Sequence, residues 1–258
     1  MNDEGPTLEA RTVTSYHDGP YGRMRSRATG APRNGMPEIV LVQGMAVADY
    51  LLPGLTAFSS WTRAHLVELP GFAGSGDPSH ELDVPEFGRC VAHWLSAHDL
   101  GRVILIGHSS GTQVAARAAL DRSDVAAVVL AGPTVDPAAR GWLRLLVRWR
   151  LDSRREPPGL SDSHRPEWRR AGARRLLHTA RVHLNDALEE SVARLSVPLL
   201  VIRGRDDRIG TARWARHLSQ LVSNGSYVEV PGAHTFPWLA PEAWSPPVRH
   251  LARKVDNR

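Results

Sequence analysis

The chain has 258 residues, 42% of them hydrophobic, which is enough to bury a sizeable core in one large domain or two small ones. Its single cysteine, Cys90, excludes an intramolecular disulfide, and the lack of any run of about 18 apolar residues excludes a membrane-spanning helix. The formal charge of +5 is concentrated in residues 136–196, where 13 arginines and no lysine stand against 8 acids.

Composition also bears on location and partners. Residues 1–6 are polar and acidic and lack the charged-then-apolar order of a secretory signal, so we expect a cytoplasmic protein that meets no membrane. The arginine-rich segment has three interpretations: a solvated helix face, a surface for nucleic acid or another acidic partner, or inward arginines that bind an anionic group of a substrate. No nucleic-acid motif accompanies it, so we expect a small-molecule substrate and no nucleic acid. Nothing in the sequence indicates an oligomeric state.

Short apolar runs alternate with longer helical stretches along the chain. Residues 11–29 carry a weaker pattern and are predicted to form two short antiparallel strands. Further strands are predicted at residues 38–42, 65–69, 103–106, 125–131, 197–202 and 226–230, and helices at residues 84–98, 112–120, 211–222 and from 246 onward. Strands that alternate with helices form a parallel sheet with crossover connections, so the fold class is α/β. Cys90 falls within the first of these helices and is expected to be a small core residue.

The alternation stops between residues 132 and 195, which contain no strand-like run. This stretch is helical in character, rich in Arg and Trp, and interrupted at Pro157, Pro158 and Gly159. Because strand patterns resume after it, we interpret it as an insertion between two strands of one sheet and not as a linker between independent domains.

A serine follows the predicted strand at residues 103–106 almost directly. The motif Gly107-His108-Ser109-Ser110-Gly111 separates that strand from an Ala-rich helix, so Ser109 lies at the tip of a sharp turn between strand and helix. Such a turn crowds the backbone, which explains the flanking glycines. A serine raised out of both elements in this way is well placed to act as a nucleophile.

A serine hydroxyl needs a base to take its proton and a third group to orient that base. Candidates for both follow later strands. Asp206 and Asp207 come after residues 197–202, and His234 comes after residues 226–230. The carboxyl ends of parallel strands gather at one edge of a sheet, so Ser109, one of the two aspartates and His234 are expected to meet there.

With these motifs the chain resembles α/β-hydrolases that carry a helical cap, from about residue 37 to the C-terminus. The chain order serine, acid, histidine is the order found in that family. Five segments carry the resemblance: Val42 to Met45, Leu69 to Gly76, Gly107 to Gly111, Gly204 to Arg208, and Gly232 to His234. Together they are far more specific than the serine turn alone.

The resemblance implies a mostly parallel eight-stranded sheet flanked by helices, with a helical cap inserted after the sixth strand. It divides the chain into a core, residues 1–134 and 195–258, and a cap, residues 135–194. It also implies a triad of Ser109, His234 and Asp207, because the family's acid stands three residues after the glycine of its loop. Such a triad requires no metal and no organic cofactor.

The resemblance further implies an oxyanion hole made by the backbone N–H groups of Met45 and Ser110. Family members usually have His-Gly where this chain has Gln43-Gly44, and a glutamine side chain can still brace that loop. The residues expected around the substrate are Gln43, Gly44, Phe72, His108, Trp142 and Phe236.

The activity that follows is hydrolysis of an ester or lactone with an apolar acyl group through an acyl-enzyme. A carbon–carbon bond hydrolase of the meta-cleavage type is the alternative, because that class uses the same triad and an inward arginine would bind its carboxylate. Thioesters, and a non-catalytic receptor of the same fold, also stay open. Epoxide and haloalkane hydrolases are disfavoured because they have an aspartate in place of Ser109.

Overall fold

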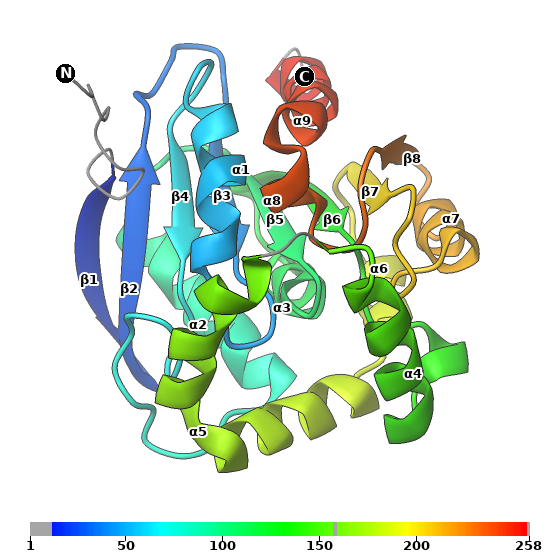
Figure 1. Cartoon of the computed structure of the whole chain (residues 1–258). Helices are drawn as coiled ribbons and strands as arrows, with labels where there is room; N and C mark the ends of the chain where they lie inside the picture. The colour runs from blue at the N-terminus through cyan, green and yellow to red at the C-terminus, as the bar shows by residue number, and fades with distance from the viewer. Residues whose placement is uncertain (1–11, 157–158, 257–258) are drawn as a thin grey trace, which may run out of the picture.

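A computed structural model describes residues 12–156 and 159–256, which leaves the N-terminal residues 1–11 and the prolines at 157–158 outside the description. Its centre is an eight-stranded sheet in the order β1-β2-β4-β3-β5-β6-β7-β8 (Figure 1). Only β1 with β2 and β2 with β4 pair antiparallel, and all other neighbours pair parallel. The predicted fold class, a mostly parallel eight-stranded sheet flanked by helices, is confirmed.

The elements have the following bounds. The strands are β1 Val13–Gly19, β2 Gly22–Thr29, β3 Glu38–Val42, β4 Ala64–Val67, β5 Val103–His108, β6 Val125–Ala131, β7 Leu199–Gly204 and β8 Gly225–Val230. The helices are α1 Leu52–Phe58, α2 Val84–Ala97, α3 Gly111–Ala118, α4 Trp142–Ser153, α5 Leu160–Asn185, α6 Leu188–Ala193, α7 Ala212–Gln220, α8 Phe236–Leu239 and α9 Pro241–Asp256, with 3-10 turns η2 Asp49–Leu51 and η3 Pro137–Ala139.

Helices cover both faces of the sheet, because side chains of a strand point alternately to opposite faces. In β3, Val40 and Val42 pack into the core shared with α2, α3 and α7, whereas Ile39 and Leu41 pack into the core shared with α1, α8 and α9. The central strands β3 to β7 are buried along their whole length, as expected for parallel strands covered on both sides. Cys90 is buried in the first of these cores, and burial raises the pKa of its thiol to about 12.

Some element boundaries differ from the sequence predictions. The strand predicted at residues 65–69 spans Ala64–Val67, and the last helix begins at Pro241, not at Pro246, because proline is also well tolerated at the start of a helix. Helices α1 and α8 are short, and neither was predicted, because a helix of one or two turns carries too little periodicity to stand out. The two antiparallel strands expected within residues 11–29 are β1 and β2.

Three helices, α4, α5 and α6, lie between β6 and β7, where the sequence predicts an insertion, and we call residues 135–194 the inserted segment. In Figure 1 it runs across the lower part of the view, with α4 at the lower right and α9 at the top. Helix α5 changes direction at Gly172, whose φ of 77° lies in the left-handed region that glycine reaches without strain. Among the described residues, none of the helices combines the length and the apolar character that a bilayer crossing needs.

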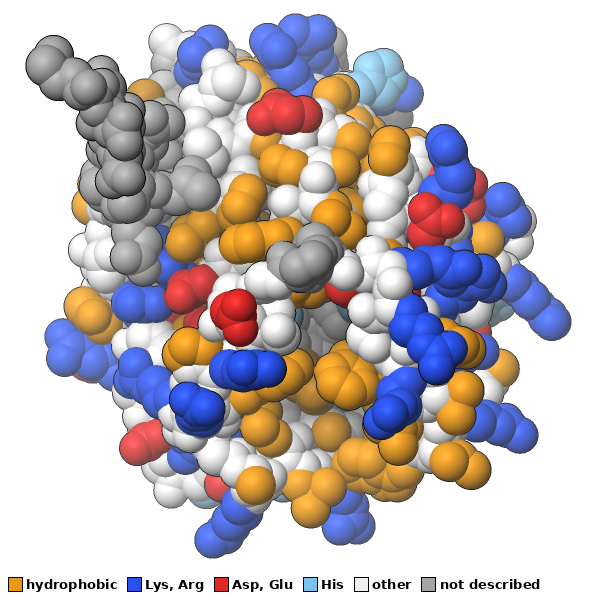
Figure 2. All heavy atoms as spheres, in the orientation of Figure 1, with side chains coloured by type: hydrophobic (Ala, Val, Ile, Leu, Met, Phe, Trp, Pro, Cys, Tyr) orange, Lys and Arg blue, Asp and Glu red, His pale blue; other side chains and the backbone are white. Residues whose placement is uncertain are grey.

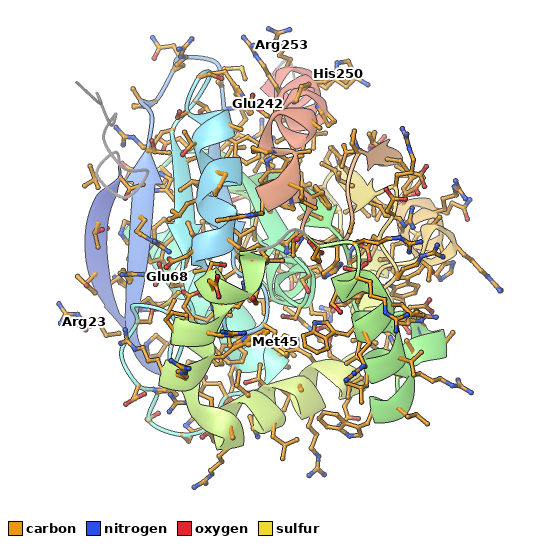
Figure 3. All side chains as sticks on the ribbon, viewed as in Figure 1. Arg23, Met45, Glu68, Glu242, His250 and Arg253 are labelled. Atoms are coloured by element: carbon orange, nitrogen blue, oxygen red, sulfur yellow. The ribbon has the colours of Figure 1, made fainter. Side chains whose placement is uncertain are left out.

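A buried carboxylate ties β2 to the loop after β4. The Glu68 side chain, which Figure 3 labels, is fully buried. It forms ion pairs of 2.7 Å with Arg25 and with Arg27, and it accepts a hydrogen bond of 2.7 Å from the Gly74 N–H. The Arg27 side chain is also buried. This loop leads to the edge of the sheet where Ser109 lies, so Glu68 supports the site from outside it.

We predict that Glu68→Ala lowers the free energy of unfolding by about 3 kcal/mol, because it removes the buried carboxylate that pairs with Arg25 and Arg27 and leaves the buried Arg27 guanidinium only the more exposed Asp49 as a partner. Urea unfolding measures the change. The matched control is Glu242→Ala, an exposed acid near the start of α9 that Figure 3 labels at the far end of the molecule. We expect it to change stability by no more than about 0.5 kcal/mol. Equal losses in the two variants would contradict this assignment.

Candidate active site

The turn between β5 and α3 holds Ser109 in a strained backbone conformation with φ of 55°. The turn is so tight that a Cβ atom on Gly107 would lie 2.2 Å from the Gly111 carbonyl oxygen. A Cβ on Gly111 would lie 2.3 Å from the carbonyl oxygen of Gln43. Only glycine therefore fits on either side, and the backbone lifts the Ser109 hydroxyl above the edge of the sheet.

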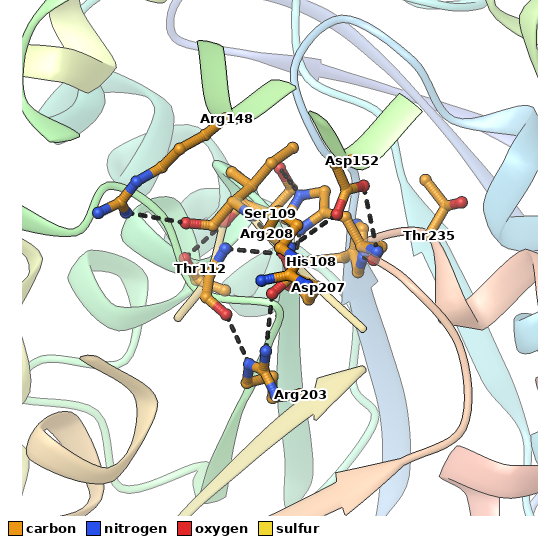
Figure 4. A network of polar contacts seen from close by, with 12 residues as sticks. His108, Ser109, Thr112, Arg148, Asp152, Arg203, Asp207, Arg208 and Thr235 are labelled. Atoms are coloured by element: carbon orange, nitrogen blue, oxygen red, sulfur yellow. Dashed lines mark hydrogen bonds and ion pairs between the residues drawn. The ribbon is translucent and has the colours of Figure 1, made fainter. Parts of the chain in front are cut away.

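Three side chains from three loops meet at this edge (Figure 4). The Ser109 Oγ lies 2.8 Å from His234 Nε2, and His234 Nδ1 lies 2.9 Å from Asp207 Oδ2. Since the Asp207 carboxylate can only accept, the neutral imidazole carries its proton on Nδ1, and Nε2 accepts from the serine hydroxyl. Asp207 and His234 are buried, so the contacts are shielded from water. The exposed Asp206 makes no side-chain contact with His234 among the described residues.

The loop that carries Asp207 is held from two sides. Its Oδ1 accepts hydrogen bonds from the backbone N–H groups of Ile209 (2.7 Å) and Gly210 (2.8 Å), which leaves Oδ2 for the histidine. The buried Arg203 guanidinium, at the end of β7, donates to the carbonyl oxygens of Asp207 (2.7 Å) and Gly210 (2.8 Å). Arg203 was not predicted as a site residue. The sequence pattern that could have indicated it is an arginine that directly follows the apolar residues of a buried strand.

His108 connects the serine turn to the loop of His234. Burial lowers the pKa of His108 well below its ordinary value, so the ring is neutral. Its Nε2 lies 3.0 Å from the His234 carbonyl oxygen, which can only accept, so Nε2 carries the proton and Nδ1 accepts from the Tyr50 hydroxyl at 2.5 Å. Tyr50 itself lies in the 3-10 turn η2 that follows β3. This chain of hydrogen bonds joins the loop after β3, the turn at Ser109 and the loop after β8.

Met45 and Ser110, the residues expected to supply the oxyanion hole, both line the cavity next to Ser109. Gly44 lies directly behind: a Cβ atom there would be 3.3 Å from the Ser109 Cβ and 2.6 Å from the Tyr50 hydroxyl. Gln43 is buried, and its Oε1 accepts from the Leu69 N–H at 3.3 Å. The glutamine therefore braces the loop, while it does not line the cavity.

The cavity above Ser109 has a volume of about 600 Å³ and mostly apolar walls. The core contributes Met45, Val47, Tyr50 and Ile209, and the inserted segment contributes Val135, Trp142, Leu145, Leu146, Trp149, Leu160, Trp168 and Leu184. His108 and Trp142 line it as predicted by the sequence. Phe72 and Phe236 do not, because their rings turn into the two cores, against Phe87 and Trp244 respectively.

Two acids of the inserted segment also reach the cavity. Asp152, at the end of α4, is buried; its Oδ1 accepts from the Arg208 N–H at 2.8 Å and its Oδ2 from the His234 N–H at 3.3 Å. Glu156 accepts from the Thr235 N–H at 3.0 Å and also contacts the Thr235 hydroxyl. These contacts tie the inserted segment to the loops that carry Asp207 and His234. Neither residue was predicted.

The charges around His234 set its protonation. Burial alone would lower the pKa of its imidazole, but the carboxylate of Asp207, followed by those of Asp152 and Glu156, raises it above its ordinary value. Burial, together with Asp152, raises the pKa of Glu156 to about 7. Along the described chain, no arginine or lysine lines the cavity, although the inserted segment contains 13 arginines.

A third acid of the inserted segment supports the loop after β3. Glu167, in the middle of α5, accepts hydrogen bonds from the N–H groups of Ala48 (2.8 Å) and Asp49 (3.4 Å). Burial, with a smaller contribution from Asp49, raises the pKa of Glu167 to about 7. The inserted segment thus touches all three loops that surround Ser109. Within residues 12–156 and 159–256, no group of three or more His, Cys, Asp or Glu is arranged to hold a metal ion.

Comparisons with known proteins bear on the whole chain. The model of the alpha/beta hydrolase family matches residues 39–245. A search of the curated proteins returned no match. Among solved structures, the chain is similar to a membrane phospholipase A described as a bacterial virulence factor, with a TM-score of 0.75 and 18% identity over 97% of this chain and 88% of the other.

Two further structures are similar at comparable levels. The enol-lactonase from Burkholderia xenovorans LB400 has a TM-score of 0.70 and 19% identity over 92% of this chain and 99% of its own. A thermophilic esterase from Thermogutta terrifontis has a TM-score of 0.72 and 19% identity over 95% of this chain and 99% of its own. At these identities the similarity establishes the fold.

We predict that Asp152→Asn lowers the pKa of the His234 imidazole, because it removes a negative charge that favours the protonated ring. NMR titration of the ring resonances measures the shift directly, without a substrate. The wild-type ring should titrate above 6.5, its ordinary value, and the variant at a lower pH.

The matched control is Asp206→Asn, which removes the same charge from the loop of Asp207, at an exposed position. It should leave the titration of His234 within about 0.2 units of wild type, because exposed charges are screened. An Asp152→Asn titration that coincides with wild type would rule out the electrostatic role of Asp152.

Proposed function

The chain belongs to the alpha/beta hydrolase family, and on that premise we propose that it is a serine hydrolase that cleaves an uncharged, apolar ester or lactone. The observation that carries the proposal is the hydrogen-bonded series of Ser109, His234 and Asp207, at 2.8 Å and 2.9 Å. A hydroxyl held at this distance from an imidazole, itself oriented by a buried carboxylate, is the arrangement that activates a serine.

The proposed reaction has two halves. Ser109 attacks the acyl carbonyl while His234 takes the hydroxyl proton, and the N–H groups of Met45 and Ser110 stabilise the oxyanion. His234 then gives its proton to the leaving alcohol, and an acyl-enzyme remains. Water, deprotonated by His234, attacks the acyl group and releases the acid and the free serine. Asp207 holds the Nδ1 tautomer and stabilises the imidazolium throughout.

The lining of the cavity favours an uncharged substrate over one that carries a carboxylate. Asp152 and Glu156 are the acids in its wall, and the described lining contains no arginine or lysine that would pair with an anion. A carboxylate buried beside them would lose its hydration and meet like charges. This composition weighs against the carbon–carbon bond hydrolase, whose substrate would need an inward cation. Two structural neighbours are named as an esterase and an enol-lactonase, which is the same class of reaction.

We further propose that the inserted segment, residues 135–194, is a cap over a core of residues 1–134 and 195–258. Its support is twofold: α4 and α5 supply most of the apolar wall of the cavity, and their acids bond to the loops around Ser109. A cap of this kind excludes water from the acyl group and sizes the substrate.

We predict that Ser109→Ala reduces kcat/KM for p-nitrophenyl butyrate by about 10³-fold or more, because the nucleophile is lost. Ser110→Ala is the matched control: it removes the neighbouring hydroxyl and keeps the backbone N–H, so we expect a change of less than about fivefold. Near-wild-type turnover by Ser109→Ala would refute the mechanism. Stoichiometric binding of esters without turnover by the wild type would favour a receptor instead.

We predict that p-nitrophenyl butyrate is cleaved at least about tenfold better than p-nitrophenyl hemisuccinate, whose acyl group ends in a carboxylate. Because Glu156 has a pKa of about 7, it gains its charge between pH 6 and pH 8, and the preference should grow over that range. Glu156→Gln should remove this growth, whereas Glu190→Gln, at an exposed position of α6, should retain it. A preference for the hemisuccinate would contradict this prediction and would favour the alternative function, a carbon–carbon bond hydrolase.

A further inference from the structure

Helix α4 presents its apolar residues in an unusual direction. In a surface helix the apolar face normally packs on the core. Here Leu143, Val147 and Leu151, which are four residues apart, face outward with 74%, 49% and 45% of their surface exposed. They do not line the cavity. The inner side carries the buried Asp152 together with Leu145 and Trp149, which line the cavity.

This exposure is concentrated in one place. Of the ten large hydrophobic residues that are exposed within the described ranges, six lie on α4 and one on the neighbouring α5. These seven are Trp142, Leu143, Leu146, Val147, Trp149, Leu151 and Leu177. Trp142, Leu146 and Trp149 also line the cavity, and the other four do not. Single exposed apolar residues need no explanation, but a cluster of this kind marks an interaction surface.

Unpaired arginines accompany the cluster. Arg150 and Arg154 near the end of α4, and Arg174 and Arg181 on α5, are exposed and make no ion pair or side-chain hydrogen bond within residues 12–156 and 159–256. Trp142 joins the two helices, because it lines a hollow of about 430 Å³ together with Arg174, Leu177, His178 and Arg181. Figure 2 shows blue side chains over orange ones at the lower right, in the region of α4.

We propose that this outer face of the inserted segment docks onto an anionic lipid surface. We define the face by Leu143, Val147, Leu151 and Leu177 with Arg150, Arg154, Arg174 and Arg181. The leucine and valine side chains would enter the boundary between headgroups and acyl chains, while the guanidinium groups would bind lipid phosphates and carboxylates. The proposed contact is peripheral and requires no membrane-spanning helix, and it departs from the sequence-based expectation that the protein meets no membrane.

Charge complementarity selects this partner over two others. A second copy of the chain, docked through the same face, would bring unpaired arginines against unpaired arginines across a two-fold axis. Nucleic acid would pair with the arginines but would leave Leu143, Val147 and Leu151 in water or against phosphates. An anionic lipid surface satisfies both the charged and the apolar members of the face.

The position of the face fits an enzyme with an apolar substrate. Helix α4 separates the two surfaces: Leu145, Trp149 and Asp152 line the cavity, whereas Leu143 and Val147 belong to the outer face. A molecule that partitions into lipid would then be presented beside the cavity and would not have to cross bulk water. The docking itself does not depend on the proposed reaction, so its test does not require turnover.

The test is sedimentation of the full chain with sucrose-loaded vesicles. We expect at least about tenfold stronger binding to vesicles of phosphatidylcholine and phosphatidylglycerol (7:3) than to phosphatidylcholine alone, with a decrease at higher salt. Arg150→Gln/Arg154→Gln should weaken binding to the anionic vesicles by roughly tenfold. Leu143→Ser/Val147→Ser should weaken binding to a similar extent. None of these residues lines the cavity, so hydrolysis of a soluble ester should stay near wild type.

The matched control is Arg249→Gln/Arg253→Gln on α9, which removes two exposed arginines with the same four-residue spacing. It should bind like wild type. Equal binding to both kinds of vesicle, or equal losses in the α4 and α9 variants, would overturn the proposal. A dimer in sedimentation velocity that Leu143→Ser/Val147→Ser dissolves would overturn it in favour of a second copy. Vesicle binding by a chain that hydrolyses no ester would leave the docking intact and refute only the proposed function.

Discussion

The tight turn at Ser109 is the constraint on which the rest of the site depends. Its glycines let α3 start directly beside the Gln43 carbonyl, so the loop after β3 and the turn after β5 are locked together by contact. Parallel pairing of β5, β6, β7 and β8 then brings the loops of Asp207 and His234 to the same edge. Backbone geometry fixes the position of the Ser109 hydroxyl, and the loops after β7 and β8 place Asp207 and His234 beside it. Hydrogen bonds of Arg203 and His108 hold these two loops in place.

The fold and the centre of the site follow from local signals. Ser109, Asp207 and His234 could be predicted because each stands just after a strand, and the rule for parallel sheets says where strand ends meet. The surrounding groups could not be predicted in this way. Tyr50, Asp152 and Glu167 act through contacts between segments that are distant in the chain, and no spacing in the sequence encodes how an inserted helix is rotated. Phe72 shows the same limit, because a motif locates a loop but not the direction of its ring.

Acids and arginines of the inserted segment differ in where they point. Three of its eight acids, Asp152, Glu156 and Glu167, contact the loops around Ser109, while many of its arginines point outward. Of the three interpretations of the arginine-rich stretch, inward binding of a substrate anion has the least support, because no described arginine reaches the cavity. The positive net charge of the segment therefore describes its outer surface, whereas the acids that it contributes to the cavity wall, Asp152 and Glu156, carry the opposite sign.

The hydrogen bonds of Asp152 affect the exchange of two backbone amide protons with solvent. One carboxylate occupies the backbone N–H groups of both Arg208 and His234, which lie in different loops of the sheet edge. Separation of the end of α4 from the loops would expose both amide protons to solvent at once. If that separation is the route of exchange, the exchange rates of the two protons rise and fall together.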